Sequence, residues 1–181
     1  MVGCSSHSSV PDHLVLRGFS NEVTYQEQYH LAKPKTMSLK SLSRQINNSV
    51  TYRYGVGEGD LNTAKEVILM VKKSAKGEGA RSFTEAFDEG CQLYQHRQES
   101  IQGLLTQSEV MACEPKHGRS GMVVANKSIR GPYHWFVATY YIPFDGTNQI
   151  NPQDFESLPV SPDQRFHLHQ FLTRTHLQVT P

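Results

Sequence analysis

Apolar side chains recur at third or fourth positions through residues 82–107, with an interruption at Arg97 and Gln98, and this spacing predicts one long amphipathic helix. Ser82 suits the N-cap position of this helix, and Glu85, three residues later, would complete a capping box. The predicted apolar stripe consists of Phe83, Ala86, Phe87, Gly90, Cys91, Tyr94, Ile101, Leu104 and Leu105.

The same spacing predicts a second helix over residues 61–75 and a shorter one over residues 38–46. Gly77 and Gly79 supply a C-cap and a short connection between the two long helices. We therefore expect an antiparallel helical hairpin.

After Ser108 the pattern changes to strand-like runs over residues 109–113, 122–126 and 133–142. Short connections rich in turn residues separate these runs and favour antiparallel neighbours. Along the third run, Trp135, Val137, Thr139 and Tyr141 would share one side, and Tyr133, Phe136, Ala138 and Tyr140 the other. The predicted fold class is α+β, with the helical hairpin and a C-terminal helix packed on an antiparallel β-meander.

The chain length suits one ordinary domain. We expect residues 1–36 to be a polar N-terminal tail or irregular cover, in which residues 14–16 would add an edge strand, and residues 37–181 to be a single α+β domain. Residues 50–54 alternate weakly like a strand. The final helix would begin after Ser161, with Pro162 in the first turn and Gln164 at the capping-box position.

The net charge is +1, from 18 basic and 17 acidic residues, so no long-range attraction to nucleic acid or anionic lipid is expected. No apolar run approaches the ~18–20 residues of a transmembrane helix. Aromatic side chains near Arg130 favour a protein partner over stacked bases.

Cys4 lies in Met1-Val2-Gly3-Cys4-Ser5-Ser6, which resembles the junction at which bacterial lipoproteins are cleaved and lipidated. The resemblance implies a lipid anchor at Cys4, followed by a polar tether. No apolar signal segment precedes Cys4 in this sequence, so either it has been removed or the similarity is accidental. The expected location is extracytoplasmic if Cys4 is lipidated and cytoplasmic otherwise.

Cys91 and Cys113 allow two interpretations. In an oxidising space they could pair and close a loop of about 23 residues, for on the order of 3 kcal/mol of stability. In a reducing cell both would be small, buried, apolar side chains, which is the interpretation preferred on the sequence alone.

Cys91, His134 and Asp145 follow the order of a catalytic set that resembles that of papain-like cysteine hydrolases and deamidases. In those enzymes a cysteine opens a central helix, a histidine opens a later strand, and a carboxylate or amide orients the imidazole. The resemblance implies a thiolate nucleophile at Cys91 with His134 as its base.

Residues 113–121, CEPKHGRSG, resemble the C-x5-R-S loop of cysteine phosphatases. Pro115 lacks the N–H that such a loop donates, and the following residues predict a strand where the phosphatase loop leads into a helix. What remains is a hairpin tip with several N–H groups for a small anion. The residues of this predicted anion contact are Lys116, His117, Arg119 and Ser120.

The sequence predicts no cofactor and no metal. The glycine-rich residues 55–60 lack the spacing of a dinucleotide-binding loop or a P-loop. His167, His169 and His176 lack further ligands at zinc-site spacing.

Two functions follow as hypotheses. The first is a non-catalytic interaction or assembly subunit with a protein partner, such as a subunit of an extracytoplasmic or secretion-related complex. The alternative is the papain-like hydrolase or deamidase that uses Cys91, His134 and Asp145.

Overall fold

The structure is a computed structural model that describes residues 10–19, 24–35, 37–44, 50–55, 68–75, 90–115, 120–132, 134–145 and 154–180. Within these ranges the chain forms ten β-strands, one α-helix and one short 3-10 helix. Their bounds are β1 (Val10–Phe19), β2 (Thr24–Lys33), β3 (Ser38–Arg44), β4 (Val50–Gly55), β5 (Ile68–Ala75), β6 (Cys91–Ile101), β7 (Leu104–Cys113), β8 (Gly121–Arg130), β9 (His134–Phe144), η2 (Phe155–Ser157), α1 (Pro162–Arg174) and β10 (His176–Thr180).

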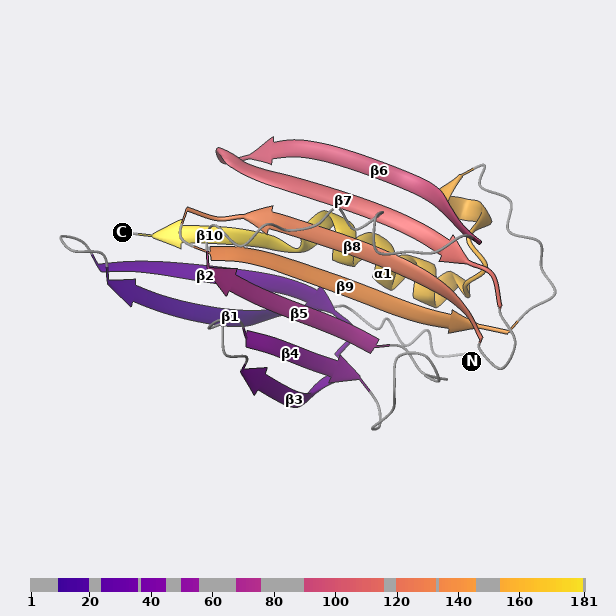
Figure 1. Cartoon of the computed structure of the whole chain (residues 1–181), viewed down its shortest axis with the longest axis horizontal. Coiled ribbons are helices and arrows are strands. Elements are labelled where there is room, and N and C mark those ends of the chain that lie inside the picture. Colours follow the sequence, from indigo (N-terminus) through magenta and orange to yellow (C-terminus); the bar gives the residue numbers. More distant parts are fainter. Residues whose placement is uncertain are drawn as a thin grey trace, which may run out of the picture.

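Two antiparallel sheets contain all of the described strands (Figure 1). The larger has seven strands in the order β3-β4-β5-β9-β8-β7-β6, and the smaller has three in the order β1-β2-β10. β6 to β9 form a meander, and β9 then pairs with β5, which attaches the earlier meander β3-β4-β5.

One face of the large sheet packs on α1 and on the small sheet, which lie behind its central strands in Figure 1. Tyr29 of β2 stacks on Phe136 of β9 with ring centroids 4.8 Å apart. Tyr140 of β9 packs against Phe171 of α1, with centroids 5.5 Å apart. A single apolar cluster therefore joins both sheets and the helix. β2 contributes to this cluster, although it lies within residues 1–36, which the sequence suggested as a polar tail or irregular cover.

The predicted α+β fold with a helical hairpin is wrong: the described residues are mostly β-strand, in antiparallel sheets, with α1 as the one α-helix. Residues 91–101 and 104–113 are the strands β6 and β7, joined by a two-residue turn at Gln102 and Gly103. Both turn residues have positive φ, 53° and 78°, as a type I′ hairpin turn requires. Residues 68–75, expected in the second helix, form β5, and residues 38–44, expected in a short helix, form β3. The earlier parts of both long predicted helices lie outside the described residues.

Two β-bulges explain part of this error. On β3 the register shifts between Leu39 and Ser41, and on β6 it shifts between Leu93 and Gln95. An extra residue in a strand places side chains three positions apart on one side, so a bulged strand imitates the spacing of a helix.

Several other predictions are confirmed. The strands predicted at residues 109–113, 122–126 and 50–54 form parts of β7, β8 and β4, and residues 14–16 lie on β1, an edge strand of the small sheet. The alternation along β9 is as expected, because Phe136, Ala138 and Tyr140 join the core. Ser161 caps α1, because its hydroxyl oxygen accepts a hydrogen bond from the Gln164 backbone N–H at 3.2 Å. The Gln164 side chain accepts one from the Ser161 backbone N–H in return, which completes the capping box.

Candidate functional site

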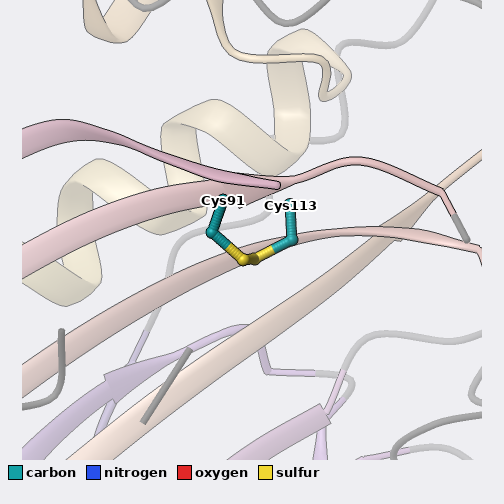
Figure 2. Close-up of a disulfide and its surroundings, with 2 residues drawn as sticks. All are labelled: Cys91 and Cys113. Carbon is teal, nitrogen blue, oxygen red and sulfur yellow. A yellow bond between two sulfur atoms is a disulfide. The ribbon is translucent and has the colours of Figure 1, made fainter. Parts of the chain in front are cut away.

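Cys91 and Cys113 form a disulfide at the outer end of the β6–β7 hairpin (Figure 2). They are register partners, the first residue of β6 and the last of β7. The Glu114 amide donates a hydrogen bond to the Gly90 carbonyl at 3.0 Å, just beyond the disulfide. Hydrogen bonds alternate along an antiparallel pair, so Cys91 and Cys113 occupy the non-hydrogen-bonded position, where paired side chains are closest.

The preferred interpretation of two separate buried thiols is therefore corrected. Both cysteines are half-buried rather than fully buried, and Cys91 lies on a strand, not on a helix. In the disulfide neither sulfur is a thiolate, which is the form that acts as a nucleophile.

His134 lies at the start of β9 and contacts the buried carboxylate of Glu27 on β2. The His134 amide donates a hydrogen bond to Glu27 Oε1 at 3.3 Å, and His134 Nδ1 lies at short hydrogen-bonding distance from Oε2. Glu27 is fully buried, whereas the His134 side chain is 19 % exposed. The Gly131 amide also donates to the His134 carbonyl at 2.9 Å, which closes the β8–β9 turn. The pair therefore joins this turn to the small sheet.

The structure does not bring Cys91, His134 and Asp145 together. Following the register from β6 across β7 and β8, Cys91 lies level with Pro143 of β9. Pro143 is nine residues from His134 along one strand, which is roughly 30 Å. Asp145 is exposed and follows the far end of β9, so it does not orient the His134 ring.

Lys127 of β8 is a buried cation facing the C-terminus of α1. Its side chain lies on the core side of the sheet, and Nζ donates a hydrogen bond to the Leu172 carbonyl at 2.5 Å. The carbonyls in the last turn of a helix lack intrahelical donors and favour a positive charge. Burial lowers the pKa of the Lys127 ammonium to about 8, with Glu99 raising it and Arg97 lowering it.

A polar row crosses the opposite face of the large sheet. His96, Glu109, Asn126 and Thr139 are successive register partners on β6, β7, β8 and β9. His96 Nδ1 lies 3.0 Å from Glu109 Oε1, and the Thr139 hydroxyl donates to Asn126 Oδ1 at 3.1 Å. Glu109 is 1 % exposed, so this carboxylate depends on its protein partners for hydrogen bonds.

A cavity of about 240 Å³ lies between the β6–β7 turn and the C-terminal end of α1. Its walls combine apolar side chains of the sheets with threonine hydroxyls, so it suits a small apolar group with one or two polar atoms. The apolar residues of the walls include Ile101, Leu104, Ile129 and Leu177, and the threonines include Thr106 and Thr173.

Of the predicted anion contact, Ser120 is half-buried just before β8, whereas Lys116, His117 and Arg119 lie outside the described residues. Cys4 lies outside the described residues as well.

Within the described ranges no three His, Cys, Asp or Glu side chains are grouped as metal ligands would be. The same part of the chain has no helix with the length and apolar character that crossing a membrane requires.

The histidines at the end of the chain make local contacts. The His176 ring stacks on His30 of β2 with centroids 4.4 Å apart, and its Nδ1 lies 2.9 Å from the Arg174 carbonyl. His169 packs against Phe155, with ring centroids 6.3 Å apart.

Comparison with known proteins gives no further guide to the function. No protein-family model matches the chain, and no curated protein is significantly similar to it.

Proposed function

We propose that this protein is a non-catalytic interaction or assembly subunit that folds in an oxidising, extracytoplasmic space. The observation that carries the proposal is the Cys91–Cys113 disulfide, because structural disulfides form and persist outside reducing compartments. A lipid anchor at Cys4 would fit the same location, and a secretion-related complex is one setting that both features suit.

The chemistry-bearing side chains support a structural role. Cys91 is bonded to Cys113, His134 contacts the buried Glu27, and the Lys127 ammonium binds a carbonyl at the end of α1. Each group is held by a partner that stabilises the fold. A nucleophile or general base needs an ionisable group that faces substrate instead.

The outer strands of the large sheet support a role in protein binding. Among the described strands, β6 pairs only with β7, and β3 pairs only with β4. Leu39 and Leu42 of β3 are 48 % and 47 % exposed. Strand edges with unpaired backbone groups are the surfaces to which another chain adds by strand pairing.

Thiol labelling tests the proposal against the cysteine hydrolase. The full chain is treated with iodoacetamide at neutral pH without reductant and then mapped by mass spectrometry. We expect a linked Cys91–Cys113 peptide and no alkylation of either residue. Rapid alkylation of Cys91 that slows in His134→Ala, but not in the control His169→Ala, would overturn the proposal and restore the enzyme.

A further inference from the structure

We propose that β6 pairs edge to edge with β6 of a second copy of this chain, around a two-fold axis at Gln98. This inference deepens the proposed function, on which it rests, by naming the partner and the surface. The bulge ends at Gln95, so the regular part of β6 is Gln95–Ile101. Its central residue is Gln98, and an antiparallel pair of identical segments is symmetric about its centre.

The backbone groups along this segment point in the required direction. Ile101 and Leu104 flank the two-residue turn and therefore form a hydrogen-bonded pair. Because the pattern alternates, His96, Gln98 and Ser100 direct their N–H and C=O groups away from β7. In the symmetric pair Gln98 faces its own copy and His96 faces Ser100, which yields roughly six hydrogen bonds from groups that no described strand uses.

The side chains are complementary in the same register. Arg97 of one copy would lie opposite Glu99 of the other, twice across the axis. This is a non-hydrogen-bonded position, where facing side chains approach most closely. Within one chain Arg97 Nη2 already lies 3.2 Å from Glu99 Oε2, and their side chains are 64 % and 32 % exposed. The dimer would close a ring of alternating charges in which like charges are never directly opposite.

The other edge of the large sheet lacks these features. The bulge between Leu39 and Ser41 leaves a regular stretch of only Ser41–Arg44 on β3. A short, bulged edge pairs with another chain less readily than a longer uninterrupted stretch such as Gln95–Ile101 of β6. The geometry therefore points to β6 as the self-association edge.

Charge exchange tests the register. The full chain and the variants Arg97→Glu, Glu99→Arg and Arg97→Glu/Glu99→Arg are compared by sedimentation equilibrium over a range of micromolar concentrations. We expect a wild-type dimer, weakening by about tenfold or more in each single variant, and recovery in the double variant. Thermal unfolding of each variant establishes that the single changes leave the chain folded.

Cysteine cross-linking provides a second measurement. In a Cys4→Ser background, Gln98→Cys would place two thiols at a hydrogen-bonded pair with Cα atoms about 5.5 Å apart, within disulfide range. The matched control Ser100→Cys would place its copies four residues apart along the strand, roughly 13 Å, which is too far. We expect mild oxidation to link the first variant and not the second.

A monomeric wild type, or equal cross-linking of both cysteine variants, would overturn the dimer. So would a double charge variant that is as weak as the two single variants. These results would leave the thiol-labelling result intact, so failure of the dimer is distinguishable from failure of the non-catalytic function.

Discussion

The carboxylate of Glu27 contacts both the amide and the ring of His134, a residue 107 positions later in the chain. The contact joins β2 of the small sheet to the first residue of β9 in the large sheet. Glu27 is fully buried, and a buried charge without hydrogen bonds is strongly unfavourable. The pair is therefore one of the contacts that fix the relative position of the two sheets, together with the shared apolar cluster.

Glu27→Gln removes the charge while keeping the shape of the side chain. Because hydrogen bonds to a charged group are stronger than neutral ones, we expect the free energy of unfolding to fall by about 1–3 kcal/mol. Urea unfolding measures the change. Glu156→Gln, which alters an exposed ion pair with Arg165, is the matched control and should change stability by less than about 1 kcal/mol. Equal effects of the two changes would contradict a special role for Glu27.

Gly131→Ala should destabilise the protein through a steric conflict. A Cβ at this position would lie 2.8 Å from the His134 carbonyl oxygen and 2.8 Å from Leu177 Cδ2. Overpacking of this kind typically costs about 1–3 kcal/mol, measurable by thermal or urea unfolding. Gly103→Asn is the control, because the site is open and Asn tolerates its positive φ. A stable Gly131→Ala protein would show that the turn can move.

Lys127 and three tyrosines, of which Tyr29 and Tyr140 are buried and Tyr141 is half-buried, predict a maximum in stability at alkaline pH. Burial lowers the pKa of Lys127 to about 8 from 10.5, so the native state loses this proton before the unfolded state does. The free energy of unfolding should therefore rise between about pH 8 and 10.5, by up to about 1.4 kcal/mol per pH unit. Burial raises the pKa values of Tyr29, Tyr140 and Tyr141, so stability should fall again as unfolded tyrosines ionise above pH 10.0.

Urea unfolding as a function of pH, in a Cys4→Ser background that avoids thiol exchange, measures both limbs. Lys127→Met should remove the rising limb, and Tyr140→Phe should make the falling limb shallower. A rising limb of unchanged slope in Lys127→Met would show that another group titrates there.

Removing the disulfide should lower stability without changing the fold. For a sequence separation of 22 residues, the chain-entropy model gives a loss on the order of 3 kcal/mol in Cys91→Ser/Cys113→Ser. Reduction of the wild type should give a similar shift in the urea midpoint. The double variant should not respond to reductant, and a response there would mean that Cys4 is responsible.

The elements predicted correctly from the sequence are those with an unambiguous local signal. Ser161, Pro162 and Gln164 specify the start of α1, and the alternation along β9 separates its buried and outer side chains. β5 was predicted incorrectly because a short apolar run such as Ile68–Val71 suits either a buried strand or a helix. The bulges on β3 and β6 depend on pairing with distant residues, so the local sequence does not reveal them.

The contacts described for the candidate site also depend on pairing between distant parts of the chain. Glu27 and His134 are far apart in sequence and follow no recognisable spacing, so only the tertiary structure could join them. The disulfide was open to prediction, since the sequence offered both interpretations of Cys91 and Cys113. Gln102-Gly103 was a further signal, because a glycine before the end of a predicted helix is more favourable in a turn.

The β6–β7 hairpin is a closed covalent loop, with the turn at one end and a sulfur–sulfur bond at the other. A protease that cut one peptide bond inside it would not release a fragment until the protein was reduced. For the same reason β6 cannot be exchanged alone between two molecules, since threading it out would require breaking the loop. Any association through this edge must therefore add one intact hairpin beside another.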